Sequence, residues 1–340
     1  MSGGVDSTVA AALLLEQRYD VTGVTMRVAP AAGGAPECVH DARRAARRLG
    51  IAHRVWDGAD VFEREVITDF VNEYLAGRTP NPCVRCNPRI KFGALRDAAA
   101  EVGADYFATG HYVRLEQRGP RRALRRALHR DKDQSYVLAG LAQGQLRGCL
   151  FPLGVLTKDQ TRRRALSLGL PNADRPESQE ICFVPHDDYA AFIEKRLGAP
   201  KPGPILSTRG EVLGQHRGLI RYTIGQRRGL GIAAPRPLYV VGLDPERNAV
   251  IVGHEQETYC KGLRIEPVNW GAVPAQRAPF ECLAQIRYLH RPVPATATPA
   301  DDAVEVRFHE PERAVTPGQW AVLYDADDYV LAAGTIAAAR

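Results

Sequence analysis

The sequence predicts an α/β protein in which a parallel sheet covered by helices is followed by two small β-rich, barrel-like domains. Over about the first 200 residues, short apolar segments alternate with helix-forming ones, as in a parallel sheet with helices on both faces. Residues 200–204 are rich in proline, and beyond them helical periodicity gives way to short strands separated by turn residues. We therefore expect domains at residues 1–200, 201–258 and 259–340.

The first domain is expected to begin with a loop followed by a helix. Helices are predicted over residues 8–17, 40–49, 59–75 and 92–102, and strands over residues 21–26, 51–56 and 105–109. Ligands of parallel sheets bind beyond the carboxyl ends of the strands, where Ser2–Ser7, Met26 and Thr109–His111 fall. A phosphate loop usually follows a buried strand, whereas here the loop opens the sequence. Either the start is misassigned or an upstream strand has been lost, and of the two we favour misassignment.

The second half of the chain is expected to be built from short strands. Strands are predicted over residues 238–243, 249–253, 303–308, 320–324 and 329–331. A joint near residues 259–263 divides this part into two modules.

Composition excludes several classes of protein. The chain has 340 residues, is 45% hydrophobic and contains no run of about 18 apolar residues, so we expect no membrane span. No signal-peptide pattern opens the sequence. The seven cysteines are an odd number, which favours reduced thiols in a cytoplasmic protein.

The formal net charge is +6, and arginines gather in three clusters. The clusters are Arg121, Arg122, Arg125, Arg126 and Arg130; then Arg162, Arg163 and Arg164; then Arg217, Arg221, Arg227 and Arg228. Such clusters suit a polyanion, because each neutralised phosphate releases counterions. Solvated basic faces explain them equally well, and charge alone does not separate the two interpretations.

Ser2-Gly-Gly-Val-Asp-Ser7 has the properties of a phosphate-binding loop. The glycines let backbone N–H groups approach an anion, the serines add hydroxyl donors, and the following helix adds its N-terminal dipole. The loop lacks the lysine of the Walker pattern, which favours binding of pyrophosphate over transfer of a γ-phosphate. Asp6 would repel phosphate, so Mg²⁺ is its natural partner. A plain Ser/Gly helix start with an Asp cap is the structural alternative.

Cys83 and Cys86 form a Cys-x-x-Cys pair on a proline-rich segment, Thr79–Asn87. This pair is half of a zinc site, a redox pair, or one nucleophile beside a bystander. Zinc would need two further ligands with similar spacing, and the sequence has neither a second Cys-x-x-Cys nor a His-x₃-His. We expect Arg85 and Arg89 to lower the pKa of a nearby thiol.

Two further segments carry polar or reactive side chains. Cys182 follows Glu177-Ser-Gln-Glu180, and taken alone it is best interpreted as a buried core cysteine. Asp131-Lys-Asp-Gln-Ser135 is a polar run without an evident packing role, which favours a turn.

Taken together and in order, these segments resemble the bacterial tRNA-specific 2-thiouridylases over nearly the whole chain. The matching strings are Ser2–Ser7, Thr79–Pro82 with Cys86-Asn87, Thr109–Tyr112, Lys132–Ser135, Cys182, Thr223–Gly231, Ile286–Tyr288 and Ala314–Gln319.

The resemblance implies an adenine-nucleotide hydrolase-like parallel-sheet domain in a cytosolic sulfurtransferase. ATP, accompanied by Mg²⁺, would adenylate the 2-oxygen of the wobble uridine of a tRNA, releasing pyrophosphate. A persulfide on Cys182 would then supply sulfur, and AMP would leave. Cys86 would be the partner nucleophile that forms a disulfide with Cys182 as sulfur is released, which is ordinary thiol–disulfide exchange.

The resemblance also assigns binding residues and partners. The ATP contacts fall on Ser2, Gly3, Gly4, Val5, Asp6, Ser7, Met26 and Gly110. The contacts to the target base fall on Asn81, Pro82 and Cys83. The further tRNA contacts fall on His111, Lys132, Asp133, Gln134, Arg287, Tyr288 and Gln319. The implied partners are the tRNA anticodon loop and a sulfur-donor protein, either a cysteine desulfurase or a sulfur-relay protein, and we expect a monomer.

One position departs from part of the family. Some members carry an aspartate, which resembles a general base, where this chain has Cys83, and a thiol replaces a carboxylate in that role only if its pKa is lowered. The role of Cys83 in proton transfer therefore stays open. Two other functions remain as alternatives: another ATP pyrophosphatase, such as an amidating synthetase, which needs neither Cys86 nor Cys182, and a catalytically silent RNA-binding protein.

Overall fold

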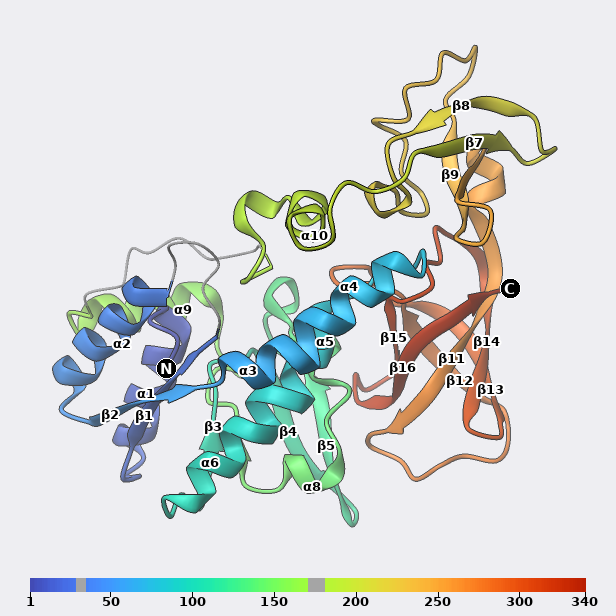
Figure 1. Cartoon of the computed structure of the whole chain (residues 1–340). Coiled ribbons are helices and arrows are strands. Elements are labelled where there is room, and N and C mark those ends of the chain that lie inside the picture. The colour runs from blue at the N-terminus through green and yellow to red at the C-terminus, as the bar shows by residue number, and fades with distance from the viewer. Residues whose placement is uncertain (29–34, 171–180) are drawn as a thin grey trace.

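The computed structural model describes residues 1–28, 35–170 and 181–340. The chain begins with the loop and helix α1 (Val5–Glu16), followed by strand β1 (Thr22–Arg27), helix α2 (Ala35–Leu49) and strand β2 (Ala52–Asp57) (Figure 1). β1 and β2 pair in parallel, with Met26 opposite Trp56. This is the predicted parallel arrangement, and the predicted helix and strand positions agree to within a few residues.

Two long helical segments follow. The first runs through α3 (Ala59–Phe62), a π-helical stretch η1 (Glu63–Ile67) and α4 (Thr68–Leu75). The second begins earlier than predicted, with α5 (Pro82–Cys86), and continues through the π-helical η2 (Asn87–Ala94) into α6 (Leu95–Glu101). It begins there because Pro82 suits the first helical turn and the side chain of Asn81 accepts a hydrogen bond from the Cys83 N–H at 3.1 Å.

The rest of the first domain contains a second parallel pair and an unexpected hairpin. Strand β3 (Phe107–Ala108) pairs in parallel with β6 (Cys149–Leu150), and β4 (Val113–Arg118) forms an antiparallel hairpin with β5 (Arg121–Arg126). The remaining elements are short helices: η3 (Arg130–Lys132), α7 (Ser135–Leu138), α8 (Gln143–Leu146), α9 (Lys158–Ser167), η4 (Pro185–Asp187) and α10 (Tyr189–Leu197). The hairpin was missed because its arginines obscure the alternation of apolar and polar residues.

The predicted change to β structure occurs after α10. A central module contains a four-stranded sheet in the order β8-β7-β10-β9, with η5 between β8 and β9. Its elements are β7 (Gly203–Ser207), β8 (Val212–His216), η5 (Leu219–Arg221), β9 (Tyr239–Asp244) and β10 (Ala249–Gly253). After η6 (Glu255–Thr258), the chain closes a six-stranded barrel in the order β11-β14-β13-β12-β15-β16. The barrel strands are β11 (Tyr259–Trp270), β12 (Phe280–Gln285), β13 (Val293–Ala300), β14 (Ala303–Arg313), β15 (Trp320–Tyr324) and β16 (Val330–Ala339).

The C-terminal barrel packs directly on the first domain. One hydrophobic cluster contains Val84 and Tyr136 from the first domain together with Trp320 and Tyr324 from β15. The Tyr136 hydroxyl donates to the Trp320 carbonyl at 2.7 Å. A shared core of this kind fixes the barrel beside the segment that carries Cys83 and Cys86.

The arginines of the β4–β5 hairpin hold the barrel in place. Arg118 pairs with Asp325, and Arg126 lies 3.6 Å from Asp328. The guanidinium of Arg118 also lies over the ring of Tyr329, 4.6 Å from its centroid. Of the first arginine cluster, Arg126 and Arg130 are therefore neutralised in part by Asp328 of the barrel, which favours the structural interpretation for these two residues.

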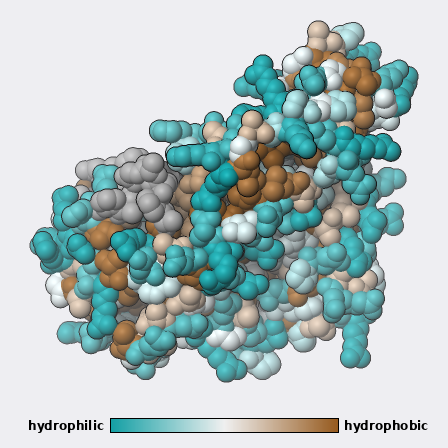
Figure 2. Space-filling view, viewed as in Figure 1, coloured by the Kyte–Doolittle hydropathy of each residue, from teal (hydrophilic) through white to brown (hydrophobic). Residues whose placement is uncertain are grey.

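Figure 2 shows that one face of the molecule is largely hydrophilic, with hydrophobic side chains near its middle and at the upper right, where Figure 1 places the central module. Among the described residues, no helix has the length and apolar character needed to span a membrane.

Candidate functional site

The loop at the start of the chain is compact and bonded to itself. The Ser2 N–H donates to the Ser7 hydroxyl at 3.1 Å, and that hydroxyl donates to the Gly4 carbonyl at 3.1 Å. Gly3 has a φ of 80°, and a Cβ there would lie 2.6 Å from the carbonyl oxygen of Cys38. Only glycine fits this position, and the loop leads directly into the first turn of α1.

Asp6 is held by a residue from the far end of the domain. The Lys158 ammonium lies 2.7 Å and 2.8 Å from the two carboxylate oxygens of Asp6, and the Tyr112 hydroxyl donates to one of them at 2.9 Å. Lys158 is buried, in the first turn of α9. The sequence analysis missed it, although the box of Thr157 and Gln160 that caps α9 was a local signal that a helix starts there.

The segment Thr109–Tyr112 connects this loop to the cysteine-bearing helix. A Cβ on Gly110 would approach the Asp6 carbonyl carbon and the Ser7 nitrogen to 2.7 Å, so the two backbones touch. The next residue, His111, has its Nδ1 atom 2.8 Å from the Thr109 hydroxyl. Burial, with a smaller contribution from the Lys91 charge, keeps the pKa of His111 well below its usual value, so its imidazole is neutral at neutral pH.

Cys83 and Cys86 occupy different environments on α5. Cys83 is exposed and Cys86 is buried. Burial raises the pKa of the Cys86 thiol to about 12, and the cation that opposes this shift is Lys91.

The two arginines expected to activate these thiols are engaged elsewhere. Arg85 lies 3.3 Å from Asp69, and Arg89 lies 3.8 Å from Glu65. The prediction for Arg85 and Arg89 is therefore wrong. The charge that favours the thiolates comes from Lys91, five residues along the helical segment from Cys86.

Cys182 lies with the other two thiols and is exposed, so its interpretation as a core cysteine is wrong. Although part of the residue is exposed, the surrounding protein desolvates its thiol and thereby raises the thiol's pKa. The charge of Cys83 adds to that shift, and the charge of Lys91 opposes it. The charges of Cys182 and Cys83 likewise raise the pKa of Cys86. The fold thus brings three unbonded thiols into one electrostatic neighbourhood. The adjoining segment Glu177–Glu180 lies outside the described residues.

Met26 lies near the carboxyl end of β1. Its side chain packs against the hydrophobic cluster that contains Cys86 and Phe183, the residue after Cys182. The end of β1 therefore lies beside the cluster that contains Cys86, and a single site shared by the loop and the thiols stays a prediction.

Comparison with known proteins assigns all three parts of the chain. Family models match a tRNA methyl transferase HUP domain at residues 1–186, a tRNA methyl transferase PRC-barrel domain at residues 190–254 and an aminomethyltransferase β-barrel domain at residues 260–336. Proteins named tRNA-specific 2-thiouridylase MnmA are similar over nearly their full length. The one from Pelotomaculum thermopropionicum is 47% identical over 99% of this chain and 95% of its own length. The one from Geobacter metallireducens is 49% identical over 100% of this chain and 96% of its own length.

The chain belongs to the tRNA-specific 2-thiouridylase family. The relative from Symbiobacterium thermophilum, 49% identical over 99% of this chain and 90% of its own, carries the same name. The resemblance and the fold class inferred from the sequence are both confirmed.

In this member of the 2-thiouridylase family, the polar run 131–135 has a packing role that the sequence analysis did not find. The Asp133 carboxylate is buried and accepts hydrogen bonds from the Ala127 N–H at 2.8 Å and the Ser135 hydroxyl at 2.7 Å. Gln134 accepts a hydrogen bond from the Tyr112 N–H at 3.0 Å. This run therefore anchors the Thr109–Tyr112 segment, and Lys132 lies at its start.

Of the three barrel residues expected to contact tRNA, Tyr288 and Gln319 lie against the first domain. The Gln319 side-chain amide donates to the Thr79 carbonyl at 2.8 Å, two residues before Asn81. The Tyr288 ring lies 6.1 Å from that of Tyr136, between ring centroids. Arg287 donates to a backbone carbonyl of β14. Sequence patterns gave no means of placing Gln319 beside Thr79 or Tyr288 beside Tyr136.

Proposed function

We propose that this chain is a tRNA 2-thiouridylase that activates the 2-oxygen of the wobble uridine with ATP and replaces it with sulfur carried by Cys182. The observation that supports this most is the joint placement of Cys86 and Cys182 with a phosphate-type loop, connected through Thr109–Tyr112. Pyrophosphate-releasing enzymes without sulfur chemistry need the loop but have no use for the paired thiols.

The proposed reaction has two stages. In the first, the 2-oxygen of the uridine attacks the α-phosphorus of ATP, and pyrophosphate leaves from the Ser2–Ser7 loop. In the second, the outer sulfur of a Cys182 persulfide attacks the activated carbon, and AMP leaves with the former 2-oxygen. The Cys86 thiolate then attacks the inner sulfur of Cys182, which forms the Cys86–Cys182 disulfide and releases 2-thiouridine. An external dithiol must reduce that disulfide before the next turnover.

Each residue of the proposed site has a different role in this reaction. The raised pKa of Cys86 keeps it protonated, so it attacks only after losing its proton, whereas exposed Cys182 is open to a sulfur-donor protein. Asn81, Pro82 and Cys83 stand at the start of α5, where a base extruded from the anticodon loop would lie beside both thiols. Asp6 is ion-paired with Lys158, so we expect Mg²⁺ to enter with the ATP phosphates.

The test is reconstitution with a tRNA transcript, ATP and a cysteine desulfurase that supplies persulfide sulfur. We expect 2-thiouridine in the digested tRNA, detected by mass spectrometry, together with equal amounts of AMP and pyrophosphate. Cys182→Ser should abolish 2-thiouridine while pyrophosphate is still released, because the adenylation stage does not use Cys182 and AMP leaves only when the persulfide attacks. Cys260→Ser, in the barrel, is the control and should behave like the parent chain.

Three outcomes would contradict the proposal. Thiolation by Cys182→Ser would refute the persulfide mechanism. AMP release that requires ammonia and not tRNA would favour an amidating synthetase. Binding of tRNA without AMP release would favour an RNA-binding protein.

A further inference from the structure

The third arginine cluster differs from the first in having few partners. Arg221 pairs with Glu194. Within the described ranges, no ion pair is found for Arg217, Arg227 or Arg228, or for the nearby Arg236, and all four are exposed. These charges are therefore available to an external anion in a way that those of Arg118, Arg126 and Arg130 are not.

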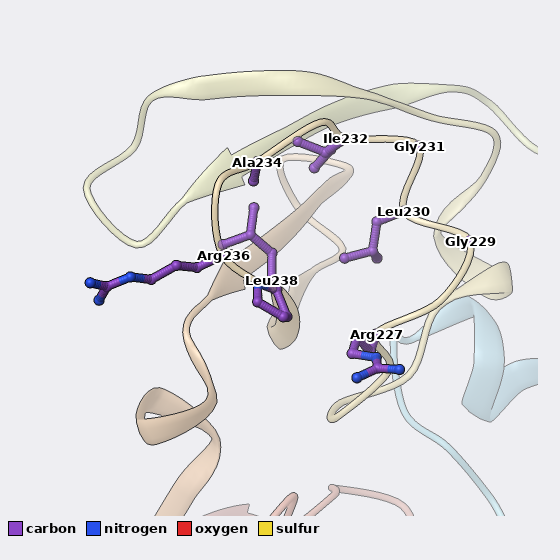
Figure 3. Close-up of a pocket in the computed structure, with 9 residues that line it drawn as sticks. Arg227, Gly229, Leu230, Gly231, Ile232, Ala234, Arg236 and Leu238 are labelled. Carbon is purple, nitrogen blue, oxygen red and sulfur yellow. The ribbon is translucent and has the colours of Figure 1, made fainter.

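Two of these arginines border a pocket in the central module. The pocket has a volume of about 300 Å³ and is formed by the loop between η5 and β9 (Figure 3). We call it the central pocket; its lining residues are Arg227, Gly229, Leu230, Gly231, Ile232, Ala234, Arg236, Pro237 and Leu238. Figure 3 shows Leu230 and Leu238 within the curve of the loop, with the Arg227 and Arg236 side chains on different sides of it.

Backbone hydrogen bonds hold the base of the loop between η5 and β9. The Gly225 N–H donates to the Val240 carbonyl at 2.8 Å, and the Val240 N–H donates to the Gln226 carbonyl at 2.9 Å. Leu230 is buried in the core of the module with Val240. A ligand would therefore meet a preformed apolar floor, which lowers the entropic cost of binding.

The backbone of the loop also has unused donors. Across the described chain, no N–H of residues 227–238 donates to a backbone carbonyl. Gly229 and Gly231 have φ values of 78° and 68°, and having no side chain of their own they leave the approach to the backbone open. Free N–H donors beside guanidinium groups are a suitable environment for phosphate oxygens.

We propose that the central pocket binds one unstacked nucleotide of the tRNA outside the catalytic site, with its base on Leu230 and Leu238 and its phosphates at Arg227 and Arg236. RNA is favoured over an acidic protein because the pocket is small, has an apolar floor and is flanked by guanidinium groups, which suit a single base with its phosphates. The proposal rests on the proposed function, since it takes tRNA as the partner.

The test compares two double variants of the full chain. Arg227→Ala with Arg236→Ala removes the pocket charges, and Arg47→Ala with Arg163→Ala removes two exposed charges on α2 and α9 of the first domain. Binding of a full-length tRNA transcript is measured over a range of salt concentrations. We expect the pocket variant to bind at least about tenfold more weakly, with a salt slope smaller by about one to two, because roughly 0.9 counterions are released per phosphate contacted. The control should change little.

A second readout locates the nucleotide. Hydroxyl-radical footprinting should show a short stretch of tRNA backbone that is protected by the parent chain and exposed with the pocket variant. At saturating tRNA the pocket variant should thiolate at the parent rate, because no catalytic group has changed.

The outcomes distinguish the two proposals. If the parent chain neither binds nor thiolates tRNA, the proposed function fails. If the parent thiolates tRNA and both double variants lose affinity equally, the effect is one of general charge and the pocket proposal is wrong. If tRNA affinity is unchanged while sulfur delivery from the donor protein falls, the pocket binds an acidic protein instead.

Discussion

The ammonium group of Lys158 lies within 2.8 Å of both carboxylate oxygens of Asp6, although 152 residues separate them in the chain. This ion pair joins the first turn of α1 to the first turn of α9. Lys158 is buried, and the Asp6 side chain keeps 32% of its surface exposed. The pair therefore connects the phosphate-type loop to the interior of the domain.

Lys158→Met is expected to destabilise the fold by about 1–3 kcal/mol, less than the ~3–5 kcal/mol of a fully buried pair, because Asp6 is partly hydrated. Urea unfolding measures this. Adding Asp6→Asn should restore part of the loss, since it removes the unpaired charge. Additive losses in the double variant would mean that the two side chains are not coupled.

Gly110→Ala is expected to weaken ATP binding by tenfold or more. Its Cβ would meet the Asp6 and Ser7 backbone at 2.7 Å, so the loop must move. Gly144→Ala, in α8, is a matched control because nothing lies within 4 Å of its added Cβ. Isothermal titration with ATP compares the two, and equal affinities would show that the loop does not depend on this contact.

Lys91→Met is expected to raise the pKa of Cys182, because the Lys91 ammonium stabilises the thiolate. The rate of alkylation of Cys182 by iodoacetamide, followed by mass spectrometry, should then rise only at higher pH than in the parent. Lys261→Met, which changes an exposed lysine on β11, should leave the profile unchanged. An unshifted profile for Lys91→Met would remove Lys91 from the account of thiol activation.

His111 predicts a pH dependence of stability. Its folded-state pKa is depressed by burial, so the unfolded chain binds more protons as pH falls through the unfolded value of about 6.5. The contribution of neutral His111 is present above that pH and is lost as pH falls below it. Parent and His111→Gln chains should therefore differ more in urea unfolding at pH 7.5 than at pH 5.5. A constant difference would mean that His111 does not titrate on unfolding.

Arg118→Ala is expected to loosen the barrel without affecting RNA affinity. It loses the ion pair with Asp325 and the stacking on Tyr329, together worth about 1–2 kcal/mol of stability. The melting temperature should fall, and the salt slope of tRNA binding should stay at the parent value. A reduced slope would show that Arg118 contacts the RNA backbone as well as the barrel.

The sequence by itself determined the local features of this protein. The serines and glycines of Ser2–Ser7 fix a loop before a helix, and Asn81 with Pro82 begins α5, because capping and backbone preferences act within a few residues. The alternation of elements also determined the fold class, and the ordered strings identified the family.

Only the tertiary structure decided how charges and thiols are used. The sequence shows that Arg118, Arg85 and Lys91 are cations, but their effect depends on which groups lie within a few ångströms, and folding sets those distances. Folding placed Arg118 against the barrel, paired Arg85 with Asp69, and left Lys91 where its charge acts on Cys86 and Cys182. Burial is likewise a property of the whole fold, which is why Cys182 is exposed and Asp133 is buried, contrary to what their neighbours in sequence suggested.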